Sequence, residues 1–133
     1  PRYIDIMSAL VVLQIVKTRI DLQLLASRKN KVDTTSQLIE LIQLKYELKG
    51  TMKAIGHDMI EIISLADNNF PGMTQEMIDD QLLYLEEQYE HVQIRYDEIC
   101  TELKQTRQSW KTCRANYEAL KNDCQIIKSV ATV

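Results

Sequence analysis

The chain has 133 residues, of which 45% are apolar and 26% charged, and this composition is typical of one folded domain rather than a disordered segment. Three Gly and two Pro leave too little turn material for a many-stranded fold, so a few long helices are expected. A net charge of −3, without a basic stretch interleaved with aromatic residues, argues against a nucleic-acid partner.

The first predicted helix carries apolar residues on two faces. One face, at steps of three and four, comprises Ile6, Leu10, Leu13, Val16, Ile20 and Leu24; the other comprises Ile4, Val11, Ile15, Leu22 and Leu25. One partner helix cannot cover both faces. We therefore predict that the second face mediates self-association into a homo-oligomer, a dimer or higher. The alternative is that this helix folds back within the monomer to make a three-helix bundle.

The stretch from Ile4 to Val16 is the most apolar part of the chain, and it bears on membrane association. A membrane span needs about 20 residues, so this stretch is too short to cross a bilayer. It also lacks the basic start and the cleavage pattern of a signal peptide. A membrane partner is therefore not expected.

A polar tract without Gly or Pro follows at residues 27–36. It predicts either a continuous or mildly kinked helix, which we favour, or a short break in the N-terminal arm capped by Asp33 or Thr34. A further helical stripe then comprises Leu41, Leu44, Leu48, Met52, Ile55, Met59, Ile62 and Ala66. Gly50 falls inside this stripe, which stays in phase across it.

The strongest break in the chain is the cluster of turn formers from Asp67 to Gly72, where Pro71 denies a helical hydrogen bond. Thr74 is the predicted N-cap of the next helix. These signals predict an arm over 3–66, a turn over 67–73 and a second arm over 74–129.

The second arm shows the clearest pattern in the chain, an apolar seam at alternating steps of three and four that is typical of a coiled coil. The seam comprises Ile78, Leu82, Leu85, Tyr89, Val92, Tyr96, Ile99, Leu103, Thr106, Trp110, Cys113, Tyr117, Leu120, Cys124 and Ile127, among which only Thr106 suits burial poorly. Two arms of similar length predict a single all-α domain over residues 1–133, an antiparallel coiled-coil hairpin that assembles into a helical bundle. Paired residue numbers would sum to about 140, with Leu13 near Ile127.

This pairing brings basic residues together near the middle of the arm, namely Arg28, Lys29, Lys31, Arg107, Lys111 and Arg114. They form either a solvated face or a docking site for an acidic protein. The same pairing of the two arms also places basic residues of the first arm across from acidic residues of the second, which would be a favourable electrostatic match. The basic residues are Lys45, Lys49 and Lys53, and the acidic ones are Glu86, Glu87, Glu90 and Asp97.

Residues that could carry chemistry are sparse. Cys100, Cys113 and Cys124 form no Cys-x-x-Cys pair, and two of them lie on the seam, which favours a reduced, cytoplasmic protein. The pairs His57-Asp58 and Glu87-His91 lack a third ligand or a nucleophile at useful spacing. No phosphate-binding Gly-rich loop or His-Glu-x-x-His motif is present. We therefore predict no enzyme activity, no cofactor and no metal.

The sequence thus predicts a non-enzymatic coiled-coil module for protein–protein interaction or scaffolding, although no stretch carries the motif of a particular family. The alternative is a structural subunit of a helical filament or of a secretion or translocation apparatus. A third hypothesis is a helical protein that perturbs membranes through residues 4–16.

Overall fold

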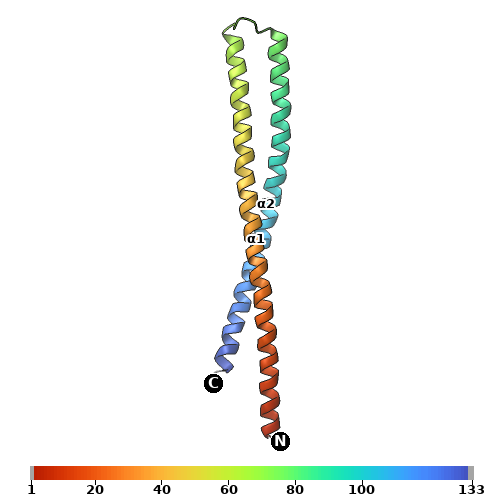
Figure 1. Ribbon diagram of the computed structural model, residues 1–133, viewed down its shortest axis with the longest axis vertical. Coiled ribbons are helices and arrows are strands. Elements are labelled where there is room, and N and C mark those ends of the chain that lie inside the picture. The colour runs from red at the N-terminus through yellow and green to blue at the C-terminus, as the bar shows by residue number, and fades with distance from the viewer. Residues whose placement is uncertain (1, 132–133) are drawn as a thin grey trace. The chain divides into compact units, whose positions relative to one another are not determined.

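Two helices make up the fold in the computed structural model of the chain, which describes residues 2–131. Helix α1 spans Arg2–Asp67 and helix α2 spans Gln75–Ala131. They pack against each other as an antiparallel hairpin (Figure 1), which confirms the predicted all-α helical hairpin. Because α1 is continuous through residues 27–36, the break in the N-terminal arm and the three-helix bundle are both wrong. Its Lys, Arg and Gln residues are good helix formers, and no Gly or Pro interrupts them.

The end of α1 is closed by a Schellman motif. The backbone N–H of Phe70 donates to the carbonyl of Leu65 at 3.2 Å, and the N–H of Asn69 donates to Ala66 at 3.2 Å. Asn69 has a φ of 49° and Gly72 a φ of 88°, the left-handed conformations expected for these residue types in the turn. The turn chemistry therefore fixes where α1 stops.

The start of α2 is capped as predicted. The hydroxyl of Thr74 accepts a hydrogen bond from the backbone N–H of Met77 at 3.2 Å, so one of the unpaired N–H groups of the first turn is satisfied. Glu76 lies in that first turn, where the helix dipole favours a negative charge.

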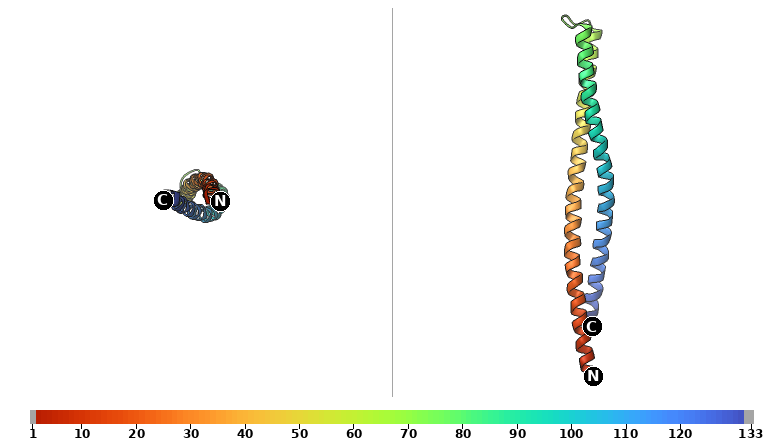
Figure 2. Two further views of the ribbon diagram at one scale, coloured as in Figure 1. Left: turned by 90° about the horizontal axis from the view of Figure 1, so that it is seen from below. Right: turned by 90° about the vertical axis from the view of Figure 1, so that its right-hand side faces the viewer.

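The chain divides into two units, which are described separately. The turn unit comprises Ile39–Gln105, and the terminal unit comprises Pro1–Leu38 with Thr106–Val133. In the turn unit the two helical segments run side by side up to the connecting turn (Figure 1). In the terminal unit the first part of α1 lies beside the last part of α2 (Figure 2).

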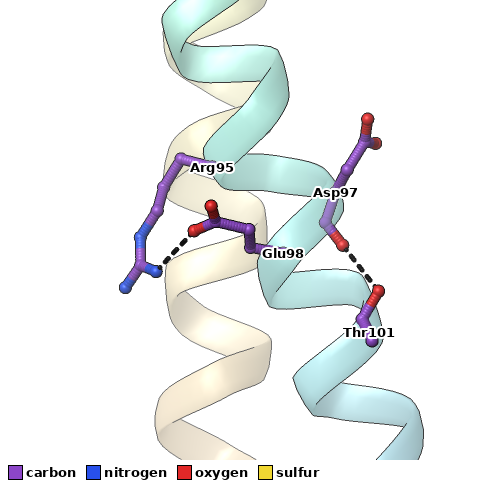
Figure 3. A network of polar contacts seen from close by, with 4 residues as sticks. All are labelled: Arg95, Asp97, Glu98 and Thr101. Carbon is purple, nitrogen blue, oxygen red and sulfur yellow. Dashed lines mark hydrogen bonds and ion pairs between the residues drawn. The ribbon is translucent and has the colours of Figure 1, made fainter.

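The core of the turn unit lies on the predicted seam. Ile99 is fully buried, and Ile78 and Leu103 are also buried. The predicted stripe from Leu41 to Ala66 is half-buried throughout, so it faces α2. Polar contacts lie on the exposed side of α2: Arg95 pairs with Glu98 at 3.1 Å, and the Thr101 hydroxyl donates to the carbonyl oxygen of Asp97 at 3.1 Å (Figure 3). No direct ion pair joins the described Lys45, Lys49 or Lys53 to the acidic residues of α2.

The terminal unit is paired in a different register from the one predicted. Cys124 contacts Asp21, and Trp110 contacts Thr35. In the predicted pairing, where residue numbers sum to about 140, each partner would lie closer to the start of α1. Both observed partners lie more than one helical turn further along α1 than that pairing requires. The first turns of α1 consequently extend past the last described turn of α2 (Figure 2). Ile6 and Leu10, predicted to lie on the hairpin seam, are therefore exposed, and Val16 of the same predicted face is exposed as well.

Candidate interaction surface

The outer face of α1 in the terminal unit, defined by Ile4, Val11, Ile15, Leu22 and Leu25, is the candidate surface. Their side chains are 68, 56, 58, 62 and 63% exposed, respectively. The inner face, by contrast, is half-buried at Leu13, Ile20 and Leu24. The hairpin therefore leaves the second apolar face of the helix uncovered, and its role in self-association stays a prediction.

The same spacing continues further than the sequence interpretation recognised. Ile4, Val11 and Leu25 belong to one seven-residue repeat, and Val32 is the next member, also exposed in the terminal unit. In the turn unit, Ile39, Tyr46 and Ile60 occupy further positions of this repeat and are exposed. Counting in strict sevens through the polar tract would have revealed these residues.

Two open grooves, each of about 420 Å³, follow the outer face, and both are formed by α1 alone. The first groove is lined by Tyr3, Ile4, Met7, Ser8, Val11 and Val12. The second groove is lined by Gln14, Ile15, Thr18, Arg19, Leu22 and Gln23. Their linings are mainly apolar and neither encloses a space deep enough for a small ligand, so they resemble the shallow holes that receive side chains of another helix.

The inner side of the terminal unit is held by polar contacts at three levels. The indole N–H of Trp110 donates to the hydroxyl of Thr35 at 3.0 Å, and that hydroxyl donates to the carbonyl of Lys31 at 2.7 Å. The Cys124 thiol donates to a carboxylate oxygen of Asp21 at 3.1 Å. This hydrogen bond, together with burial, raises the pKa of the Cys124 thiol. The buried cysteine is therefore held in its unreactive thiol form.

Cys113 lies between these levels, with its sulfur 3.8 Å from the hydroxyl of Thr34. That hydroxyl already donates its single proton to the carbonyl of Asn30 at 2.7 Å, so the thiol is the donor. Both contacts place short polar side chains where the seam of α2 meets the polar tract of α1.

The six predicted docking residues all belong to the terminal unit, and two of them contact aromatic rings. The ammonium of Lys31 lies 4.5 Å from the centre of the Tyr117 ring, and the guanidinium of Arg114 lies 5.4 Å from the Trp110 ring. Both distances are typical of cation–π contacts. The other four, which are all exposed, are Arg28, Lys29, Arg107 and Lys111. Docking of an acidic partner by these residues stays a prediction.

The prediction that the His57-Asp58 pair lacks a third ligand at useful spacing is wrong. Glu61 lies one turn further along α1, and its carboxylate, that of Asp58 and the His57 imidazole place ligand atoms within 4.8 Å of one another. The signal was the four-residue spacing of His57 and Glu61. All three side chains are exposed and come from one helix, an arrangement that solvated helix surfaces often show.

Comparisons of the chain with protein-family models, with curated proteins and with solved structures gave no match. Within residues 2–131, neither helix contains a stretch long and apolar enough to cross a membrane. The candidate surface therefore has to be interpreted from its own chemistry.

Proposed function

We propose that the chain is a non-enzymatic coiled-coil interaction or scaffold module that self-associates through the outer face of α1. The observation that carries this proposal is the exposure of Ile4, Val11, Ile15, Leu22 and Leu25, each more than half exposed in the hairpin. Contiguous exposed apolar surface on a soluble fold typically marks a site of protein contact. Its position on one face of a long helix fits association with another helix.

Energy considerations support association through this face. A fully buried large aliphatic side chain contributes about 1.5–3 kcal/mol, so one that passes from half-exposed to buried contributes roughly 1 kcal/mol. Val11 and Ile15, 56 and 58% exposed, lie near the middle of the face. In a symmetric dimer both copies bury them, which gives about 4 kcal/mol from these two positions.

The exposed basic residues of the terminal unit supply a second surface for a scaffold. Arg28, Lys29, Arg107 and Lys111 are available for an acidic protein, whereas Lys31 and Arg114 already contact aromatic rings. Charged surfaces of this kind contribute mainly to the rate and specificity of association. We propose that they select a partner after self-association has formed the scaffold.

A filament subunit is the second candidate, and one observation favours it. Exposed apolar residues of the seven-residue repeat continue at Val32, Ile39, Tyr46 and Ile60, beyond the outer face as defined above. If copies paired along this whole repeat with a stagger, assembly would not close. Unlimited growth with concentration would distinguish the filament from a fixed oligomer.

The test replaces the centre of the outer face by charge. Val11→Asp with Ile15→Asp should weaken self-association about a thousandfold, since about 4 kcal/mol of apolar burial is lost. Sedimentation velocity measures the association, and circular dichroism should show unchanged helicity because both side chains point away from α2. Gln88→Asp with Gln93→Asp is the matched control, because it adds the same charge at exposed positions of α2.

Two results would contradict the proposal. The first is a wild-type chain that remains monomeric at high concentration. The second is a control variant that dissociates as readily as the outer-face variant, because the effect would then reflect net charge rather than the apolar face.

A further inference from the structure

The two grooves on α1 carry similar side chains in opposite chain directions. Both linings alternate steps of one and three residues, a spacing that is the same in either direction, so the spacing alone sets no orientation. The side-chain types do: when the second groove is followed from Gln23 back to Gln14, Leu22, Thr18 and Ile15 take the places of Ile4, Ser8 and Val11. A two-fold axis perpendicular to α1 would place the first groove of one copy on the second groove of the other. Such an interface is isologous, so every contact occurs twice.

We infer that the outer face binds a second copy of the chain in the antiparallel sense, with Val11 of one copy opposite the partner's Ile15. This inference rests on the proposed self-association and specifies its partner, orientation and register. The seam pairs residues 4–22 of one copy with residues 22–4 of the other, within the part of α1 whose outer face carries exposed apolar side chains.

The side chains match in this register at the levels from Ile4 to Leu22. Ile4 lies opposite the partner's Leu22, and Val11 lies opposite the partner's Ile15, so apolar residues meet apolar residues. Ser8 and Thr18 are the polar residues of this seam, one in each groove. The register pairs Ser8 with the partner's Thr18. The Thr18 hydroxyl already donates to the carbonyl of Gln14 at 3.0 Å, so the Ser8 hydroxyl is the donor between the copies, and neither hydroxyl faces an apolar side chain.

The charged residues beside the seam favour the same register. Asp5 and Arg19 flank the seam at equivalent positions, and the antiparallel arrangement brings Asp5 beside the partner's Arg19 at both ends of the overlap. Both side chains are exposed, and neither forms an ion pair within the part of the chain that the structure describes. At the two-fold axis itself, Val12 meets the partner's Val12 and Gln14 meets the partner's Gln14, pairs without charge repulsion.

A neighbouring register loses the match of apolar with apolar and polar with polar side chains. A shift of the partner by one heptad places Ser8 opposite the partner's Leu25 and Ile15 opposite the partner's Thr18, so that each polar residue faces an apolar one. The same shift places Ile4 opposite the partner's Lys29 and leaves Asp5 beside an alanine. Ser8 then loses its hydroxyl partner on the other copy, whereas Thr18 keeps its hydrogen bond to the Gln14 carbonyl. An unpaired hydroxyl in a helix interface is unfavourable.

A parallel pair is also disfavoured by charge. Parallel association places each residue opposite its own copy, and the seam continues directly from Leu25 to Lys29, so two ammonium groups would meet. Asp5 would lie about 20 Å from the partner's Arg19, beyond the Debye length at physiological salt.

The test is a charge exchange in the full chain, measured by sedimentation velocity at low salt in reducing buffer. Asp5→Arg alone and Arg19→Asp alone should each raise the dimer dissociation constant at least about tenfold, because two attractive pairs become two repulsive ones. The double variant should restore wild-type affinity. An equimolar mixture of the two single variants should restore it as well, since each chain then supplies what the other lacks. High salt should reduce the differences between these samples.

The outcomes separate the inference from the proposed function. If the wild type dimerises but the single variants associate as tightly, or if neither the double variant nor the mixture recovers, the antiparallel register is wrong and self-association stands. If the wild type does not associate at all, both fail. Circular dichroism of each variant checks that helicity is unchanged, as expected for exposed positions.

Discussion

Ile99 is the residue on which the packing of the turn unit depends most, because its side chain is 0% exposed. Ile99→Ala removes three carbon atoms, equivalent to about 2.4 kcal/mol of transfer free energy at 0.8 kcal/mol each. The cavity left behind adds to this loss, although a two-helix hairpin can partly collapse around it, so the total should be about 3 kcal/mol. For a chain of this size that corresponds to a decrease of about 10 °C in the thermal unfolding midpoint.

Ile94→Ala provides the matched control, since it removes the same atoms from the same helix at a side chain that is 53% exposed. Its unfolding free energy should change by no more than about 0.5 kcal/mol, partly because Ala is the better helix former. Urea and thermal unfolding followed by circular dichroism, at equal chain concentration, measure both variants. Equal losses for Ile99→Ala and Ile94→Ala would refute the assignment of Ile99 to the core.

The remaining predictions concern two glycines and the cysteines. Gly50→Ala should raise the unfolding free energy by about 0.5–1 kcal/mol, because Gly50 is helical with no neighbouring side chain within 4 Å. Gly72→Ala should lower the unfolding free energy by about 1 kcal/mol, because the φ of +88° at Gly72 disfavours a residue with a Cβ. Urea unfolding of both glycine variants measures whether the free energy rises or falls. At pH 8, iodoacetamide should modify Cys124 more slowly than Cys113, since Cys124 is buried and its hydrogen bond to Asp21 raises its pKa. Mass spectrometry of the modified peptides measures both rates, and equal rates would contradict this prediction. Because the folded pKa lies above the unfolded value of about 8.5, this hydrogen bond stabilises the fold below that pH. The advantage of the wild type over Cys124→Ala in thermal midpoint should therefore decrease as pH rises through the folded pKa.

The predicted seam of α2 shows how much of the fold periodicity determines. Ile78, Ile99, Leu103 and Cys124 are buried as the pattern requires, and even Thr106, the residue that suits burial least, is 7% exposed. The spacing of the seam outweighs the preference of one side chain, because a helix that is held on both sides of Thr106 must present that position to its partner.

The register of the terminal unit could not be predicted in the same way. Counting back from the turn assumes that two straight helices pair residue by residue, whereas the contacts of Trp110 with Thr35 and of Cys124 with Asp21 lie further along α1. The alternating pattern fits more than one register, and short polar side chains such as Thr35 carry no hydrophobic signal. Specific hydrogen bonds in this region therefore decide what the apolar pattern leaves open.

The outer face of α1 was predictable for a different reason. Ile4, Val11 and Leu25 were recognisable because one partner helix cannot cover two apolar faces, and the structure leaves them exposed. The correspondence between the two grooves was not recognised from the sequence, because short polar side chains within an apolar face carry no hydrophobic signal. Ser8 and Thr18 in particular look unremarkable until they are seen to occupy equivalent places in the two grooves.

Self-association through the outer face of α1 is tested most directly by the mass of the chain in solution. Light scattering after size exclusion, in reducing buffer and over a wide range of concentrations, should show a species of twice the 15.5 kDa chain mass that grows no further. Val11→Asp with Ile15→Asp should reduce that mass to a single chain. A wild-type chain that remains at 15.5 kDa at every concentration would contradict self-association, and a mass that increases without limit would contradict a closed dimer.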